Sequence, residues 1–351
     1  MPSRHNNFDA LRLVAATAVI FSHAFLLSEG TEAHEPLKWL TGQTILGIVG
    51  VFVFFVISGY LVTQSWEATG SASRFAVKRG LRIWPGLALC ILLCGFVLGP
   101  LVTRLALGAY LASDGTWDFV LQNLVLNVEH NNLPGVRFSG YDAFGTAVDG
   151  PLWSLPCEVV MYAMVLALGA ARLLRLPVLL ALLALGLARL IFDQAVNDLA
   201  QSRGFVLRFA ADTSWLLAFF VAGMILYKLR HYPIFDGRVA LLAAIALVAS
   251  AALGRLVLLF PFFGAYLILY LAQTPWLPPL PAARYGDLSY GLYIYGWPVE
   301  QTLLYATGGA LAWWQLFPVA FVMSAALAFM SWHLVEKRVL RLKPTGRSAR
   351  G

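Results

Sequence analysis

Charged side chains are scarce in this sequence. Of its 351 residues only 12% are Asp, Glu, Lys or Arg, whereas 60% are hydrophobic. A soluble domain has about a quarter of its residues charged, and a chain this apolar would expose large hydrophobic patches to water. The scarcity of charge therefore excludes an ordinary soluble protein and indicates a lipid environment.

Cysteine is scarce as well, and Cys90, Cys94 and Cys157 all lie in apolar runs. That placement favours small buried side chains over a disulfide framework or a metal site. We expect no bound metal and no cofactor. The sequence shows no internal repeat, no low-complexity tract and no additional soluble domain.

Long apolar runs are what the sequence has instead. A bilayer core of about 30 Å needs roughly 20 residues of helix, and continuous runs of Leu, Ala and Val exclude the short alternating segments of a β-barrel. We predict an all-α polytopic membrane protein, a bundle of about ten transmembrane helices. It forms one integral-membrane domain over 1–351, with a core of about 8–336 and a basic tail at 337–351. The predicted spans are 8–28, 44–66, 83–103, 151–171, 176–193, 213–229, 239–254, 256–273, 287–307 and 312–335.

Basic and acidic residues alternate between successive loops, and positive residues favour the cytosolic side. The alternation predicts that both termini are cytosolic. The net charge of +7 needs no nucleic-acid partner, because the basic side faces anionic lipid head groups of the bilayer. The basic loops hold Arg74, Lys78, Arg79, Arg82, Arg172, Arg175, Lys228, Arg230 and Arg238; the acidic ones hold Glu29, Glu32, Glu35, Asp114, Asp118, Glu129, Asp142 and Asp149.

The first apolar run carries ionisable residues, which a cleavable signal peptide would not, so we interpret it as the first span. Asp9 and Arg12 are one turn apart and can pair; Arg12 is either functional or a structural anchor. His23 lies about 22 Å along the helix from Phe8, in the outer half of the bilayer. It is either a neutral core histidine or a general base that takes a proton from a hydroxyl group.

The fourth predicted span starts with Pro151 and Pro156, which suit the first turn of a helix. Glu158 then lies about two turns below the outer surface, at a depth similar to that of His23. A His–Glu pair would stabilise the imidazolium, and a carboxylate that packs helices together is the alternative. Trp153 and Ser154, at the start of this span, are candidates for the acceptor side.

The basic residues before the third predicted span include Arg79 and Arg82, one turn apart. Guanidinium groups suit phosphate, although positive residues also serve as ordinary membrane anchors. In the second span, Ser58 and Gly59 form a small pair within an aromatic wall. The pair allows close approach either of a thin ligand arm or of another helix.

The predicted loop of about 104–150 is long enough to be functional. Its aromatic residues include Trp117, Tyr141 and Phe144, which can stack on sugar rings. We interpret the loop as a lid on the acceptor side, with Tyr141 as a site residue. A plain connector is the alternative.

Several short motifs occur in an order that resembles the acyltransferase-3 family of membrane acyltransferases. Arg12 and His23 have the spacing of its Arg-x10-His motif. The other matching segments are 8–12, 50–60, 79–85, 153–158, 289–293 and 331–337. Together they cover nearly the whole chain.

The resemblance implies a ten-helix core, acyl-CoA as co-substrate and a glycan hydroxyl as the usual acceptor. By position, His23 would be the catalytic histidine and Arg12 its motif partner. Arg79 and Arg82 would contact the donor phosphates, and Glu158 would be an acceptor-side or histidine-orienting acid. We expect a multi-pass protein of the bacterial inner membrane that moves an acyl group, acetyl in the first instance, from cytosolic acyl-CoA to a glycan.

One position departs from the family pattern, because many members carry a histidine where this chain has Gly296. Two other functions stay open from the sequence. A transporter or flippase of a lipid-linked sugar would also have many helices, although such proteins often show inverted repeats. An inactive scaffold that senses acyl groups is the second alternative.

Overall fold

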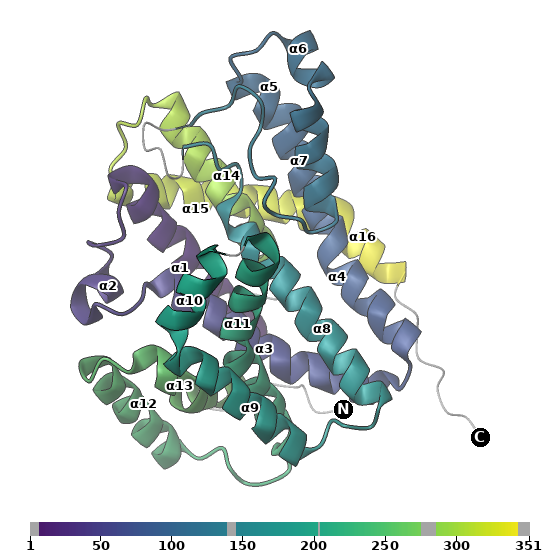
Figure 1. The fold of residues 1–351 in the computed structure, drawn as a ribbon, viewed down its shortest axis with the longest axis vertical. Helices are drawn as coiled ribbons and strands as arrows, with labels where there is room; N and C mark the ends of the chain where they lie inside the picture. Colours follow the sequence, from purple (N-terminus) through teal and green to yellow (C-terminus); the bar gives the residue numbers. More distant parts are fainter. Residues whose placement is uncertain (1–6, 139–144, 203, 275–285, 343–351) are drawn as a thin grey trace.

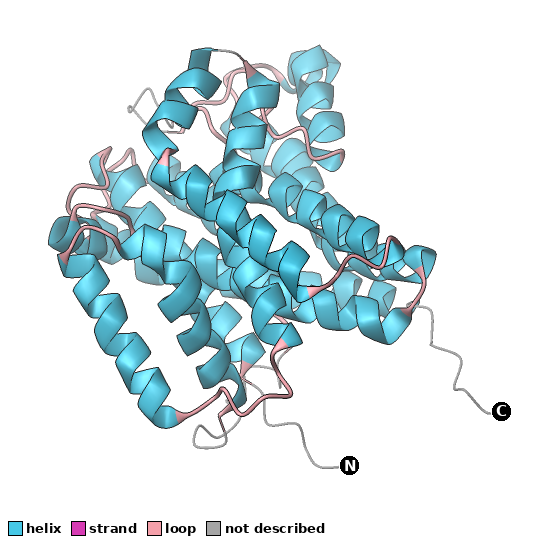
Figure 2. Cartoon of the chain, turned by 60° about the horizontal axis from the view of Figure 1, so that its bottom comes forward, coloured by secondary structure: helices cyan, strands magenta, loops and turns pink. Residues whose placement is uncertain are grey.

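The chain folds into helices throughout. The computed structural model describes residues 7–138, 145–202, 204–274 and 286–342. Within these residues the regular elements are helices and none is a strand, so the predicted all-α class is confirmed (Figure 2). The first half of the chain contains α1 (Phe8–Glu29), α2 (Pro36–Thr41), α3 (Leu46–Thr69), α4 (Ala72–Leu93), the π-helical turn η1 (Cys94–Leu98), α5 (Gly99–Val102), α6 (Leu107–Ala112) and α7 (Asp114–Leu124).

The second half begins with a short 3-10 helix that leads directly into a long helix. These two are η2 (Gly150–Trp153) and α8 (Ser154–Ala170), with Pro151 and Pro156 in the first turns as expected. The remaining helices are α9 (Leu176–Ile191), α10 (Asp193–Ser202), α11 (Phe205–Lys228), α12 (Gly237–Ala252), α13 (Leu256–Gln273), α14 (Ser289–Ala306), α15 (Trp313–Ser331), η4 (Trp332–Glu336), α16 (Lys337–Val339) and η5 (Leu340–Leu342).

All ten predicted spans coincide with helices, but fewer qualify as membrane-spanning. Seven described helices are long and apolar enough, or eight if α9 and α10, which meet at a bend of 75°, form one broken span. Helix α12 has only 16 residues, and α14 has polar residues such as Glu300 and Gln301 on its buried face. Within the described residues the number of qualifying helices is thus slightly below the expected ten, because α12 is short and α14 carries polar residues.

Helix α4 starts earlier than predicted. It begins at Ala72, so Arg79 and Arg82 lie on the helix and not in a loop before it. The preceding helix α3 ends at Thr69 and is capped by Gly70, whose φ of 60° is left-handed and favours glycine. This two-residue turn holds the end of α3 beside the start of α4. Figure 1 shows the start of α4, the end of α8 and α16 on the right-hand side of the bundle.

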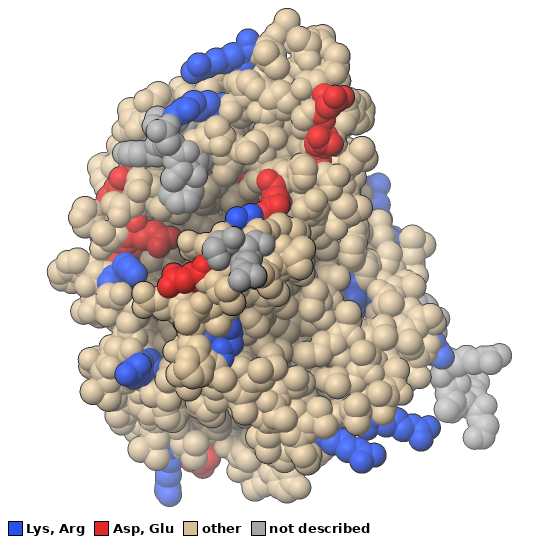
Figure 3. Space-filling model, in the orientation of Figure 1, with Lys and Arg blue, Asp and Glu red and all other residues tan. Residues whose placement is uncertain are grey.

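The outer surface suits lipid. Large apolar side chains of α12 such as Leu241, Leu242, Ile245 and Val248 are more than half exposed. Most of the face shown in Figure 3 is neither acidic nor basic. A soluble protein would cover such surfaces with charge, whereas lipid accepts helices whose backbone groups are bonded internally. The protein is therefore a multi-pass membrane protein.

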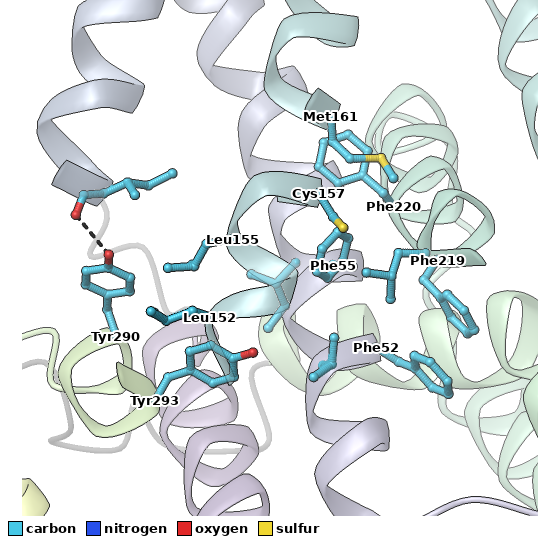
Figure 4. Close-up of a cluster of buried hydrophobic side chains, with 14 of the residues drawn as sticks. Phe52, Phe55, Leu152, Leu155, Cys157, Met161, Phe219, Phe220, Tyr290 and Tyr293 are labelled. Atoms are coloured by element: carbon cyan, nitrogen blue, oxygen red, sulfur yellow. Dashed lines mark hydrogen bonds between the residues drawn. The ribbon is translucent and has the colours of Figure 1, made fainter. Parts of the chain in front are cut away.

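Helices α3 and α11 cross in direct backbone contact at the centre of the bundle. A Cβ on Gly59 would lie 1.9 Å from the carbonyl oxygen of Phe220, and one on Gly223 would lie 2.1 Å from that of Val56. Phe52 of α3 stacks on an aromatic ring of α11 beside this crossing (Figure 4). Gly59 therefore serves a helix crossing and not a ligand arm, because the backbone of α11 fills the space that its missing side chain leaves.

The predicted loop of about 104–150 is partly helical, since it contains α6 and α7. Trp117 of α7 packs on Phe96 at 5.4 Å between ring centroids, and its indole N–H donates to the carbonyl of Leu111. This side chain therefore supports the fold. Tyr141 lies outside the described residues, and its predicted role stays a prediction. The three cysteines are buried and free, as expected.

Candidate active site

An elongated cavity of about 590 Å³ opens among α1, α3, α4, α8, α14 and the last short helices. It follows one face of α3 from Val51 to Ala68, a length of about 25 Å at 1.5 Å per residue. Arg12, Arg79 and Arg82 all line it. The structure thus brings the three predicted arginines, which come from two helices, to one cavity.

Arg82 is already neutralised. Its Nη2 lies 2.5 Å from Oδ2 of Asp287, and Nη1 of Arg12 lies 4.0 Å from the same oxygen. Burial alone would raise the pKa of Asp287, but the charges of Arg82 and Arg12 outweigh it and lower that pKa. Asp287 was not identified from the sequence. Its signal was an acidic residue at the first position of a predicted span, at an end that is otherwise basic.

Arg79 is the arginine whose guanidinium group is only partly satisfied by hydrogen bonds and ion pairs within the described chain. It donates to Oγ of Ser65 at 3.3 Å, and its guanidinium lies 5.7 Å from the ring centroid of Tyr162. In the described chain its buried Nε has no hydrogen-bond partner and no carboxylate pairs with it. A buried donor of this kind is costly unless a ligand supplies the acceptor. Arg79 is therefore the strongest candidate for binding an anion.

Glu158 faces the same cavity. Its Oε1 accepts hydrogen bonds from Oγ of Ser58 at 2.7 Å and from the hydroxyl of Tyr162 at 2.6 Å. Ser58 thus lies at the cavity, as expected, but its hydroxyl is bonded to the carboxylate. The expected pair of Glu158 with His23 does not form, because Glu158 turns toward α3 and the arginine end while His23 meets a different carboxylate.

That carboxylate belongs to Glu300 of α14. Its Oε2 lies 3.9 Å from Nδ1 of His23, its side chain is fully buried, and in the described chain neither of its oxygens accepts a hydrogen bond. Sequence reasoning missed Glu300, although it is an ionisable residue inside a predicted span. His23 was identified because an ionisable residue inside a membrane span is costly and is usually functional, and the same reasoning applies to Glu300.

One stripe of α14 connects the cavity to this pair. Tyr293 lines the cavity, Trp297 lies one turn further, and Glu300 follows on the next turn. The indole of Trp297 meets the imidazole of His23 edge to face at 4.9 Å. Residues three or four apart share a helix face. His23 is not part of the cavity lining; it contacts Trp297, which lies about 6 Å beyond Tyr293 along α14 at 1.5 Å per residue.

The start of α8 closes the cavity near this stripe. Ser154 lines the cavity and its Oγ is 2.7 Å from the hydroxyl of Tyr293; Figure 4 shows Tyr293 directed toward Leu152 at this position. Gly150 lies directly against the indole of Trp297, where a Cβ would approach the ring to 3.0 Å. Trp153 turns away from the cavity and lines a second pocket.

Gly296, which stands where related proteins often have histidine, packs against α1. A Cβ at this position would lie 2.8 Å from Cγ1 of Ile20, one turn before His23. A histidine would therefore meet Ile20 first. The close contact of α1 with α14 explains the glycine and brings His23 to Glu300.

A helical membrane bundle with a polar internal cavity and a buried histidine–carboxylate pair has the components of a membrane-embedded enzyme. The chain belongs to the acyltransferase-3 family, because the family model described as "Acyltransferase domain" matches residues 5–333. The protein is thus an acyltransferase. It is 27% identical to an O-acetyl transferase of Shigella phage Sf6, over 96% of both chains. It is 31% identical to nodulation protein 10 of Rhizobium leguminosarum bv. viciae, over 96% of this chain and 94% of the relative. No solved structure matches it significantly.

Proposed function

We propose that the protein moves an acetyl group from cytosolic acetyl-CoA to a hydroxyl group of a glycan on the other side of the bacterial inner membrane. The observation that carries the proposal is the cavity, which runs from three arginines at one end toward the His23–Glu300 pair at the other. The relative named O-acetyl transferase supports the acetyl group and the oxygen acceptor. Both termini then lie in the cytosol with the arginines.

The donor would enter at the arginine end. Arg79 offers an unsatisfied guanidinium N–H, and guanidinium groups bind the phosphates of CoA in charge-assisted pairs. Arg82 and Arg12, tied to Asp287, add positive charge and hold the end of the cavity in shape. The elongated cavity suits a linear thioester arm that points toward Tyr293.

The transfer itself would occur between the end of the cavity and His23. The imidazole takes the proton of the acceptor hydroxyl, whose oxygen attacks the thioester carbon. The carbon–sulfur bond breaks, and the CoA thiolate leaves with the proton that the imidazolium returns. Glu300 stabilises the imidazolium from 3.9 Å, the role of the buried carboxylate in a catalytic triad. Glu158 would orient Ser58 and Tyr162 around the arm.

The test is a comparison of glycans from cells that lack the protein with those from cells that express wild type or His23→Ala. Mass spectrometry of envelope and secreted glycans should show a gain of one acetyl group per modified sugar with wild type and none with His23→Ala. His34→Ala is the matched control, because His34 is an exposed histidine whose side chain is 69% accessible. It should behave as wild type.

A donor assay separates binding from chemistry. Acetyl-CoA should bind His23→Ala as tightly as wild type, and should bind Arg79→Gln at least about tenfold more weakly, since a charged hydrogen bond is lost. Arg74→Gln, an exposed arginine of the same helix, is the control. Full acetylation by correctly folded His23→Ala would refute the proposed mechanism.

A further inference from the structure

A second polar pocket lies on the far side of the first turn of α8. It has a volume of about 270 Å³ and is lined by Trp153, Arg189, Asp193, Asn197, Asp212 and Trp215. These residues come from η2, α9, α10 and α11, and we call the pocket the tryptophan pocket. Figure 1 shows α10 alongside α11, and Figure 3 shows acidic side chains over α10. The volume of the tryptophan pocket, about 270 Å³, is close to the lower limit for ligand sites, which is roughly 300 Å³.

The pocket lies at the start of α8, whereas the guanidinium of Arg79 lies against Tyr162, eight residues further along the helix from Ser154. At the other end of the helix, Gly169 contacts the indole of Trp66, which in turn packs on Phe75 at the start of α4. Eight residues of α-helix span about 12 Å at 1.5 Å per residue. The tryptophan pocket is therefore separate from the donor end of the cavity and lies on the acceptor side of the proposed reaction.

The polar groups of the pocket are only partly satisfied within the protein. Arg189 is 7% exposed and donates to Asp193 at 2.6 Å and to Asn197 at 2.7 Å, but its buried Nε has no partner in the described chain. The exposed carboxylate of Asp212 accepts no hydrogen bond from any residue that the structure describes. The buried Nε of Arg189 is the group that a ligand would satisfy, and the exposed carboxylate of Asp212 is accessible to accept a hydrogen bond from the same ligand.

The chemistry of the lining selects one class of ligand. Two indole rings offer flat apolar faces beside polar edges, while carboxylate, amide and guanidinium groups accept from and donate to hydroxyl groups. Arg189 is the cation of the lining and stands beside two carboxylates, Asp193 and Asp212, while Arg208 also acts on Asp212; the lining therefore carries no excess of positive charge that would select an anion. A neutral sugar ring, apolar on its faces and hydroxylated at its edges, fits both parts.

A short path joins the tryptophan pocket to the reacting groups. Trp153 lines the pocket, and the next residue, Ser154, lines the cavity and meets Tyr293. Three residues before Trp153, Gly150 lies against Trp297, which contacts His23. A glycan with one ring in the pocket would direct its neighbouring ring across η2 toward the imidazole.

We propose that the tryptophan pocket binds a neutral sugar ring of the acceptor glycan, adjacent to the ring that is acetylated. The inference rests on the proposed function for the identity of the reaction, but the pocket's affinity for sugar can be measured without it. Asp212 is the most informative position. Because its carboxylate makes no hydrogen bond inside the described protein, its removal should cost sugar affinity and little stability.

The experiment uses the full-length protein in lipid nanodiscs. The probes are the methyl glycosides of glucose, galactose and N-acetylglucosamine, observed by saturation-transfer NMR. At least one should bind wild type, and the Kd should rise about tenfold or more in Asp212→Ala and Asn197→Ala, because each removes a hydrogen-bond partner of the ring. Asp198→Ala, an exposed carboxylate of α10 outside the pocket, is the control and should bind as wild type.

Acetyl-CoA binding and thermal stability, measured on the same samples, show that each variant is folded. Failure of all three glycosides to bind wild type, or unchanged binding in both Asp212→Ala and Asn197→Ala, would overturn the inference. The two proposals fail separately. Acetylation that persists in His23→Ala contradicts the proposed mechanism while sugar binding stands. Loss of acetylation in His23→Ala together with normal sugar binding in both Asp212→Ala and Asn197→Ala contradicts the pocket alone.

Discussion

The crossing of α3 and α11 gives a prediction whose size follows from the structure. In Gly59→Ala the new Cβ would lie 1.9 Å from the carbonyl oxygen of Phe220, a backbone atom that no side-chain rotation can move. Real Cβ atoms keep at least 3.0 Å from their neighbours, so the helices must separate by about 1.1 Å. Overpacking of a close-packed interior costs about 1–3 kcal/mol, and the separation also breaks the membrane-type packing of small residues.

We expect Gly59→Ala to lower the apparent melting temperature in detergent by about 1–4 °C, since the shift per kcal/mol becomes smaller as the chain becomes longer. Gly80→Ala is the matched control, because its Cβ would meet only the indole of Trp84, at 3.9 Å. Gly223→Ala presses on Val56 across the same crossing and should act like Gly59→Ala. The double variant should have its melting temperature lowered by less than the sum of the two single shifts, since one separation of the helices relieves both clashes. Equal melting temperatures for Gly59→Ala and Gly80→Ala would refute the reasoning.

Activity should follow the same pattern. Ser58 is the next residue on α3 and its hydroxyl donates to Glu158 at 2.7 Å. A shift of about 1.1 Å in α3 would lengthen this bond beyond useful distance. We therefore expect Gly59→Ala to lose acetylation even at temperatures where it stays folded, as read by mass spectrometry of the glycans.

Two further changes test the ends of the site. Asp287→Asn leaves Arg82 without its charge partner and should cost about 2 kcal/mol of stability. Because the pKa of Asp287 is lowered in the fold, the difference from wild type in thermal unfolding should be complete above about pH 4 and shrink below it; a difference that grows at lower pH would contradict this. Gly296→Ala should push Ile20 off α14 and lower both melting temperature and acetylation, and adding Ile20→Ala should restore part of the stability; no recovery would count against the contact.

The sequence by itself determined that the protein lies in lipid and which of its segments are helices. Apolar runs longer than a bilayer crossing need helices, because lipid offers backbone groups no other hydrogen bonds, and all ten predicted segments are helical. Motif spacing identified the family and singled out Arg12, Arg79, Arg82 and Glu158, but it placed Glu158 beside His23, whereas the structure places it in the cavity with the arginines. These features are local in the chain, so periodicity and residue type are enough to find them.

The tertiary structure alone decided which side chains meet. His23 pairs with Glu300 and not with Glu158, and Asp287 neutralises Arg82 across about 200 residues of chain. Depth along a helix is readable from a sequence, but the rotation of each helix and its choice of neighbour are set by packing across the bundle. A carboxylate at the correct depth can therefore face the wrong helix, and only the assembled bundle shows which one it faces.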